Sequence, residues 1–93
     1  MATPAYTFKR TPQFRRSFDD LSVAEQKAAK EAFAIFKNDP FDPRLRTHKI
    51  NRLSALHKKT VYSVVILNNL RAVFHKEGSV VTSLDIGSHD IYK

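Results

Sequence analysis

Three short segments rich in β-branched and aromatic residues follow one another closely in the second half of this 93-residue chain. They span residues 60–67, 70–76 and 80–86, and only Asn68-Asn69 and Glu77-Gly78-Ser79 separate them. Such runs are typical of strands, and Asn and Gly suit tight turns. Because connections this short join antiparallel neighbours, the sequence predicts a three-stranded antiparallel meander.

The first half of the chain predicts one strand and two helices. Tyr6–Lys9 alternates aromatic and polar residues, as a half-buried strand does. Thr11-Pro12 has the form of an N-cap followed by proline at the first helical position, which predicts a helix over 12–20. Ser22-Val23-Ala24-Glu25 is a capping box that begins a second helix, and Asn38-Asp39-Pro40 ends it.

Together these elements predict an α+β fold in the order β-α-α-β-β-β. Two N-terminal helices pack on one face of a mainly antiparallel four-stranded sheet. Segment 39–60 contains a double-proline turn and many basic residues, and its pattern assigns it to neither helix nor strand. The length suits a single domain over residues 1–93.

Side-chain alternation favours one register for the last hairpin. A two-residue loop at Glu77-Gly78 mixes polar and apolar residues on both faces, whereas a three-residue loop over 77–79 gives one apolar face. With the longer loop, Arg71 turns away from the helices together with Val73, His75 and Asp85. The side chains expected to face the helices are Leu70, Ala72, Phe74, Leu84 and Ile86.

Half of the basic residues lie in one stretch without acids. The chain carries 16 Lys and Arg against nine Asp and Glu, a net charge of +7, and eight of the 16 fall between Asp42 and Glu77. A concentrated basic surface is typical of proteins that bind nucleic-acid phosphates, although charge runs also occur on ordinary solvated surfaces. The cations expected to hold an RNA backbone are Arg44, Arg46, Lys49, Lys58 and Lys59.

Several kinds of site are disfavoured by the composition. The chain has no cysteine and two glycines, which argues against a disulfide scaffold, a thiolate metal site and a Gly-rich phosphate loop. The four histidines lack the HxxxH spacing of helical metal ligands, so we expect no metal and no cofactor. Because the chain lacks a membrane-spanning apolar run, a basic amphipathic helix and the apolar core of a signal peptide, we expect a cytoplasmic protein without membrane contact.

Acid–base attack on a phosphodiester is the chemistry that these residues can carry. RNA supplies its own nucleophile, the 2′-hydroxyl, so a catalyst must remove that proton, stabilise charge on the phosphate and protonate the 5′-oxygen. Histidine can carry either proton near neutral pH, and arginine clamps phosphate with a forked permanent charge. The residues that could supply these groups are His89, Arg71 and His48, with Tyr92 nearby.

The order of the motifs along the chain is also informative. It comprises the Tyr6–Lys9 strand, the helix pair, the Asp-Pro turn with Leu45 and His48-Lys49-Ile50, the strands with Val61-Tyr62-Ser63-Val64 and Leu70-Arg71-Ala72-Val73-Phe74, and the closing Ile86-Gly87-Ser88-His89-Asp90-Ile91-Tyr92. In this order and spacing the chain resembles the RelE/ParE superfamily of bacterial toxin–antitoxin toxins over nearly its full length.

The resemblance implies a small α+β toxin that a cognate antitoxin silences, and an acidic, partly helical antitoxin segment would suit the basic surface. RelE-like members cleave messenger RNA, usually on the ribosome and without metal. Arg71 matches the arginine that they place on the scissile phosphate. His48, His89 and Tyr92 resemble the histidines and the aromatic residue of histidine-using members such as YafQ.

One departure from RelE bears on the mechanism that the resemblance implies. RelE itself uses lysines where this chain has Ser63 and Val65, so we expect histidine chemistry. His89 would act as general acid or base, Arg71 as transition-state clamp and His48 as the complementary proton carrier or phosphate contact, while Tyr92 would orient the RNA. The alternatives are a ParE-like inhibitor of DNA gyrase and an inactive paralogue that only binds an antitoxin.

Overall fold

The computed structural model describes residues 6–88 and 91. The described residues begin with a strand, continue mainly as helices and end in a three-stranded meander. In chain order they are β1 (Thr7–Arg10), α1 (Pro12–Asp19), α2 (Val23–Asn38), the 3₁₀ helix η1 (Pro43–Leu45), β2 (His48–Lys49), α3 (Asn51–His57), β3 (Val61–Leu67), β4 (Leu70–Glu77) and β5 (Val80–Gly87).

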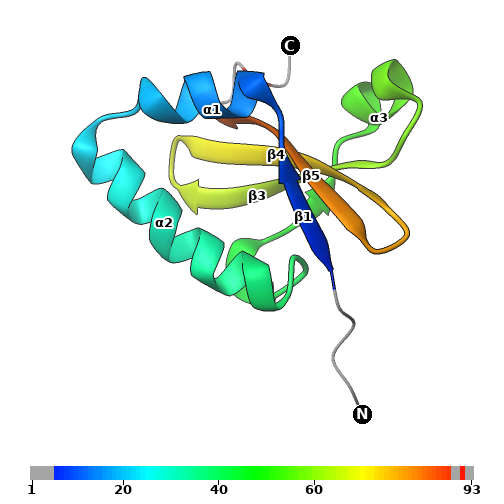
Figure 1. The fold of residues 1–93 in the computed structure, drawn as a ribbon, viewed down its shortest axis with the longest axis horizontal. Helices are drawn as coiled ribbons and strands as arrows, with labels where there is room; N and C mark the ends of the chain where they lie inside the picture. The colour runs from blue at the N-terminus through cyan, green and yellow to red at the C-terminus, as the bar shows by residue number, and fades with distance from the viewer. Residues whose placement is uncertain (1–5, 89–90, 92–93) are drawn as a thin grey trace.

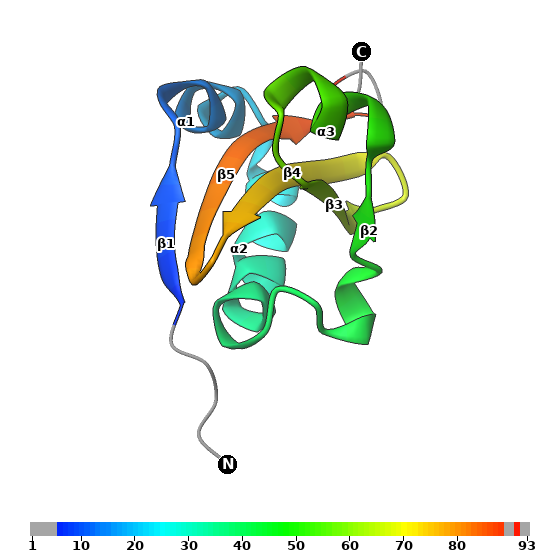
Figure 2. The ribbon, with the colours of Figure 1, turned by 90° about the vertical axis from the view of Figure 1, so that its right-hand side faces the viewer.

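The strands form one mixed sheet in the order β1-β5-β4-β3-β2. The meander β3-β4-β5 and the pair β2–β3 are antiparallel, whereas β1 runs parallel to β5. Helices α1 and α2 pack on one face, with α2 crossing behind the sheet in Figure 2 and α1 above it in Figure 1. The predicted α+β architecture is therefore confirmed, and the short strand β2 makes the sheet five-stranded in place of four.

Side-chain caps begin both N-terminal helices where the sequence predicted them. The Thr11 hydroxyl accepts a hydrogen bond from the Phe14 N–H at 3.0 Å. Ser22 and Glu25 form a reciprocal capping box, in which each side chain accepts from the backbone N–H of the other residue at 3.0–3.1 Å. These bonds satisfy N–H groups that the first helical turn leaves without partners.

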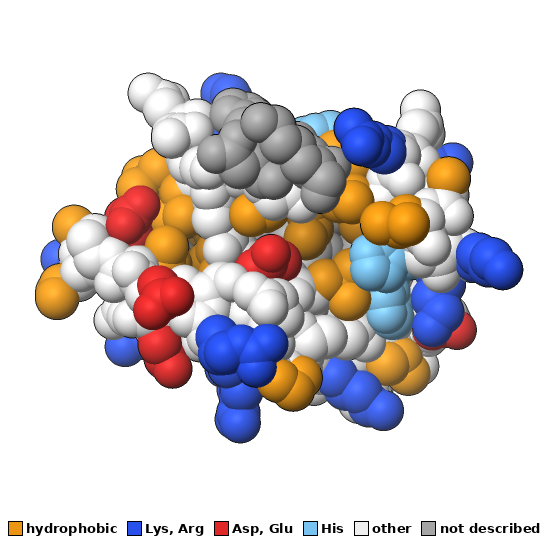
Figure 3. Space-filling view, turned by 90° about the horizontal axis from the view of Figure 1, so that it is seen from above, with side chains coloured by type: hydrophobic (Ala, Val, Ile, Leu, Met, Phe, Trp, Pro, Cys, Tyr) orange, Lys and Arg blue, Asp and Glu red, His pale blue; other side chains and the backbone are white. Residues whose placement is uncertain are grey.

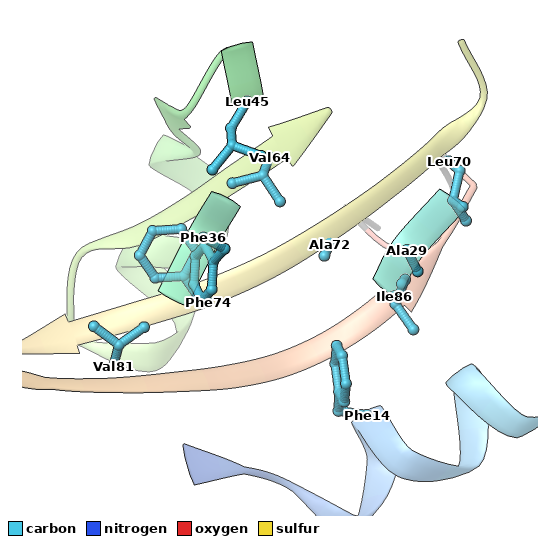
Figure 4. Packing of buried hydrophobic residues seen from close by; sticks show 10 residues of the cluster. All are labelled: Phe14, Ala29, Phe36, Leu45, Val64, Leu70, Ala72, Phe74, Val81 and Ile86. Atoms are coloured by element: carbon cyan, nitrogen blue, oxygen red, sulfur yellow. The ribbon is translucent and has the colours of Figure 1, made fainter. Parts of the chain in front are cut away.

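The main core lies between α1, α2 and the sheet (Figure 4). Phe36 of α2 meets Phe74 of β4 edge to face, with ring centroids 5.0 Å apart, and Phe74 in turn stacks against Tyr62 of β3 at 5.3 Å. Tyr62 is therefore part of this core. The buried members of the core are Phe14, Ala29, Phe36, Leu45, Val64, Leu70, Ala72, Phe74, Val81 and Ile86.

Helix α3 was not predicted, and it covers part of the other face of the sheet (Figure 2). Leu53 of α3 packs against Val61 and Val73. The Ser54 hydroxyl donates to the Ile50 carbonyl and accepts from the Val61 N–H, both at 2.8 Å, which ties the helix to the strand that follows. A seven-residue helix with a single buried residue gives too weak a pattern to be recognised from sequence.

The last hairpin differs from the predicted three-residue loop, which is wrong. Glu77 pairs with Val80, so the loop is the two residues Gly78-Ser79, with Gly78 at φ 57° in the first position, where type II′ turns place glycine. A bulge then shifts the register of β5 between its pairs with Phe74 and Val73. As a result, Leu84 packs with Val73 on the face away from α2, and its prediction as a helix-facing residue is wrong.

Candidate functional site

The face of the sheet opposite α2 carries two adjacent rows of candidate residues. The cross-strand register forms the first row from His48, Ser63 and Val73 and the second from Val65, Arg71 and Gly87. We call this surface the Arg71 face. His48 and Arg71 are two strands and one row apart, which corresponds to about 12 Å between their backbones. The prediction that Arg71 turns away from the helices is confirmed.

The guanidinium of Arg71 is fixed by the turn between β3 and β4. Its Nη1 donates to the carbonyl oxygens of Leu67 and Leu70, at the two ends of that turn. Among residues 6–88 and 91, neither Nε nor Nη2 of Arg71 has a hydrogen-bond partner, so these two nitrogens can still donate to an anion. A fixed guanidinium with two open nitrogens suits a bidentate contact to phosphate.

The described end of the chain folds back beside Arg71. Gly87 is the register partner of Arg71, and a Cβ atom at Gly87 would lie 2.9 Å from Cγ2 of Ile91. Ile91 packs against the cluster of Leu53, Val61 and Val73, and its N–H donates to the Ser88 carbonyl at 3.1 Å. The candidates His89 and Tyr92 lie outside the described residues, and their described neighbours Ser88 and Ile91 lie next to the Arg71 row.

His48 is exposed on β2, and its Nδ1 lies 2.9 Å from the carbonyl oxygen of Arg46. This contact favours the tautomer that carries a proton on Nδ1, which leaves Nε2 as the proton acceptor. Ser63 and Val65 lie on the same face between His48 and Arg71, so the strand between the two candidates carries no charge on this face.

Arg46 and Lys58 are open cations on the two connections that flank β2 and α3. Both are exposed, both have positive φ angles (50° and 55°), and neither forms an ion pair with any described residue. Arg46 is the C-cap of η1 and Lys58 is the C-cap of α3, positions at which a left-handed backbone is common. Both side chains are therefore open to solvent and unpaired among the described residues.

The other three predicted phosphate contacts differ from this arrangement. Arg44 is engaged by Asp42 through two bonds of 2.9–3.0 Å, and this pair, with the Arg44 N–H, lowers the pKa of the Asp42 carboxyl to about 2. Lys59 forms an ion pair with Glu77 at 2.7 Å. Lys49 pairs with Tyr62, whose side chain belongs to the α2 side, so the register places Lys49 on the face away from Arg71.

His75 is a titratable residue on the Arg71 face that the site prediction did not include. Its side chain is 13% exposed, and its Nδ1 lies 4.0 Å from Glu77 without a hydrogen bond. Burial lowers its pKa, the positive charges of Lys59 and His57 lower it further, and Glu77 opposes them. The sequence could have revealed this position, because residues 71, 73 and 75 alternate along β4 and therefore share one face of the sheet.

Figure 3 shows the end of the molecule where α1, α3 and the chain end lie. Most of the acidic side chains in this view lie toward the connection between α1 and α2, whereas Lys and Arg side chains are spread over the whole view. The centre of the Arg71 face is covered, because α3 and Ile91 pack on it. We call the half-buried Arg71 and the exposed Arg46, His48 and Lys58 the basic margin.

Two further properties concern the described residues alone. No group of three or more His, Asp or Glu side chains among residues 6–88 and 91 gathers in a way that could hold a metal ion. No helix in the same residues is long and apolar enough to cross a lipid bilayer.

The comparisons with known proteins identify the fold. No family model and no curated protein matches the sequence. Solved structures do match. The RelE–RelB complex from Pyrococcus horikoshii OT3 contains a chain at 16% identity and a TM-score of 0.68, over 90% of this chain and 94% of that one. YafQ from E. coli strain BL21(DE3) matches at 11% identity and 0.67, over 92% and 96%.

A third structure matches equally well. The toxin–antitoxin complex RelBE2 from Mycobacterium tuberculosis contains a chain at 19% identity with a TM-score of 0.68, over 91% of this chain and 99% of that one. At identities this low, the structural similarity shows the fold alone, and it confirms the RelE-like fold that the resemblance implied.

Proposed function

We propose that this chain is a single-domain toxin of a bacterial type II toxin–antitoxin system and cleaves messenger RNA as a metal-independent endoribonuclease. The observation that carries the proposal is the placement of Arg71 and His48 on adjacent rows of one sheet face. The fold supports it, because two of the similar structures are complexes of a RelE-like toxin with its antitoxin. Cleavage on the ribosome, in the cytoplasm, would stop translation.

The proposed reaction needs one clamp and two proton carriers. A base removes the 2′-hydroxyl proton, the 2′-oxygen attacks phosphorus, and the bond from phosphorus to the 5′-oxygen breaks as an acid protonates that oxygen. Arg71 binds the phosphate oxygens through Nε and Nη2, where negative charge increases in the transition state. His48 accepts or donates one proton through Nε2, His89 takes the complementary role, and Tyr92 orients the RNA.

The RNA backbone would follow the basic margin of the Arg71 face. Arg46 and Lys58 contact phosphates directly, because no described acid pairs with either side chain. Arg44, Lys49 and Lys59 add a more diffuse positive potential, since two of them are paired with acids and the third lies on the other face. A cognate antitoxin with an acidic segment would compete for this margin.

Induction of the chain followed by sequencing of RNA 5′ ends tests the proposal. In cells we expect growth arrest and new RNA ends. In a cleavage assay with the purified protein we expect products that end in 2′,3′-cyclic phosphate, and EDTA should not prevent their formation. Arg71→Ala should slow cleavage by roughly 100-fold, the usual effect of removing one charge-stabilising donor. Arg15→Ala is the matched control, because Arg15 is an exposed arginine on α1 and lies outside the Arg71 face.

Three outcomes would contradict the proposal. Intact messenger RNA together with DNA breaks would identify a gyrase inhibitor. Absence of any growth effect would indicate a paralogue that only binds an antitoxin. Cleavage by Arg71→Ala at the wild-type rate would place the active site elsewhere on the protein.

A further inference from the structure

An exposed aromatic ring lies on the side of the sheet opposite the Arg71 face, in the turn between α2 and η1. Phe41 is 38% exposed, and it meets the Tyr62 ring of β3 edge to face with centroids 5.0 Å apart. Tyr62 in turn stacks on Phe74, so the exposed ring is anchored to the main core. An aromatic ring that the core holds in place and that remains open to solvent can stack with a flat ligand.

The turn that carries Phe41 is fixed on both sides of the ring. The Asp39 carboxylate accepts a hydrogen bond from the Phe41 N–H at 2.9 Å, and Pro40 is buried. The Thr47 hydroxyl donates to the Pro40 carbonyl at 2.6 Å, which ties the turn to the segment that leads into β2. A ligand that stacks on Phe41 therefore needs to order little of the chain, which favours binding.

Two lysines lie beside the ring pair on the same face. Lys49 of β2 is the register partner of Tyr62, and Lys76 of β4 lies in the next row along the sheet. Neither lysine forms an ion pair with a described residue, and the carboxylates of the turn, Asp39 and Asp42, contact neither of them. An exposed ring with unpaired cations beside it suits a nucleobase and the phosphate attached to its nucleotide.

This patch is connected to the Arg71 face around one edge of the sheet (Figure 2). Strand β2 is the outer strand at this edge, and its two residues point to opposite faces. His48 lies on the Arg71 face, and Lys49 lies on the face that carries Tyr62 and Phe41. An RNA strand that leaves the Arg71 face at His48 can therefore reach Lys49 by crossing a single strand of two residues.

We propose that Phe41, Tyr62 and Lys49 form a subsite for single-stranded RNA, in which a base stacks on Phe41 and a neighbouring phosphate contacts Lys49. The inference rests on RNA as the ligand of the proposed function, and it adds contacts on the other side of β2 from the scissile phosphate. An acidic polypeptide fits this patch less well, because the exposed ring belongs to a turn and β2 has too few residues to pair with an added strand.

Titration of the full ¹⁵N-labelled chain with a 2′-O-methyl RNA oligonucleotide of about ten nucleotides tests the proposal. This RNA lacks the 2′-hydroxyl nucleophile, so it stays intact and its binding can be measured whether or not the protein is a nuclease. We expect the amide signals of Phe41 and Lys49 to shift. Phe41→Leu should weaken binding by about tenfold, the effect of losing one stacked base. An oligonucleotide of the same length without bases should bind the wild type and Phe41→Leu equally.

Phe8→Leu is the matched control, because Phe8 is also a partly exposed phenylalanine, at 36%, but lies on the opposite edge strand β1. It should bind the RNA as the wild type does, and circular dichroism confirms that each variant folds. Equal affinity of Phe41→Leu and the wild type for the RNA would overturn the inference. So would shifts of the Phe41 and Lys49 signals by a polyglutamate peptide and not by the RNA.

The two proposals can fail separately. A wild-type protein that cleaves RNA, together with Phe41→Leu that binds RNA normally, would contradict the subsite and leave the proposed function in place. A wild-type protein that cleaves no RNA but loses RNA affinity in Phe41→Leu would contradict the nuclease and support the subsite.

Discussion

Arg71 of β4 is the register partner of Gly87 of β5, and Gly87 is the point at which the end of the chain packs back onto the sheet. The missing side chain at residue 87 lets Ile91 approach the strand directly. The position of Ser88 and Ile91 beside Arg71 therefore requires a residue without a Cβ atom at position 87. The contact links the packing of the chain end to the candidate site.

Gly87→Ala should displace the chain end and reduce activity. The new Cβ would lie 2.9 Å from Cγ2 of Ile91, a methyl on a branched Cβ that can move away only by a χ1 rotation or a shift of the residue. We expect a loss of about 1–3 kcal/mol of stability, typical of overpacking, and RNA cleavage at least ~10-fold slower. Chemical denaturation and a cleavage assay measure the two effects.

Gly78→Ala is the control for that variant. Gly78 has a φ of 57° and open space around it, so alanine there adds backbone strain of about 1–2 kcal/mol without touching the Arg71 face. Its cleavage rate should equal that of the wild type. Equal loss of activity in both variants would mean that stability alone governs activity and that the contact at Gly87 has no special role.

The sequence could predict the elements whose signals are local. Thr11 and the Ser22–Glu25 box start helices through bonds to N–H groups within one turn, so their residue types alone reveal them. The register of the last hairpin was not predictable in this way. It depends on a bulge near Leu84 that a local alternation pattern does not show, and one inserted residue moves a side chain to the other face.

In the candidate site, too, the features with local sequence signals were predictable and the features that depend on tertiary contacts were not. The face on which Arg71 lies follows from alternation along β4 and was predicted. The engagement of Arg44 by Asp42 and of Lys59 by Glu77 depends on side-chain geometry and on contacts between segments distant in the sequence. Counting basic residues in the acid-free stretch therefore overstated how many cations remain open to a phosphate.

RNA binding should depend on Arg46 more than on Arg44. Arg46→Ala removes an open cation. The negative slope of log Kobs against log salt concentration for single-stranded RNA should therefore become shallower by about 0.7. The double variant Asp42→Ala/Arg44→Ala removes an ion pair at constant net charge and should leave the slope unchanged. Fluorescence anisotropy over a salt series measures both. A larger change for the double variant would make Arg44 the direct phosphate contact.

The stability of the protein should fall in mild acid because of His75. Burial, Lys59 and His57 lower its pKa in the folded state from 6.5, so the unfolded chain takes up the proton first as the pH falls. The free energy of unfolding therefore keeps the full contribution of His75 above pH 6.5 and loses it below, as the pH approaches the folded pKa. Urea unfolding at several pH values should show this decrease for the wild type and a smaller one for His75→Gln.

Glu77→Gln tests the cause of that behaviour. Glu77 raises the pKa of His75 and also neutralises Lys59, so its removal should lower the pKa of His75 further. An NMR titration of the His75 ring reports the change directly. A higher pKa in this variant would contradict the electrostatic explanation.

Lys58→Gly should increase the stability of the protein and weaken its binding of RNA. Lys58 ends α3 with a φ of 55°, a conformation that glycine adopts without steric cost and lysine does not. We expect glycine there to stabilise the protein by about 1 kcal/mol while it weakens RNA binding, because an open cation of the basic margin is lost. Thermal unfolding and anisotropy measure the two effects.

Lys76→Gly is the control for the loss of charge, since it removes a cation from the interior of β4 and should destabilise the protein. A Lys58→Gly protein that is more stable and binds RNA as tightly as the wild type would remove Lys58 from the proposed interface.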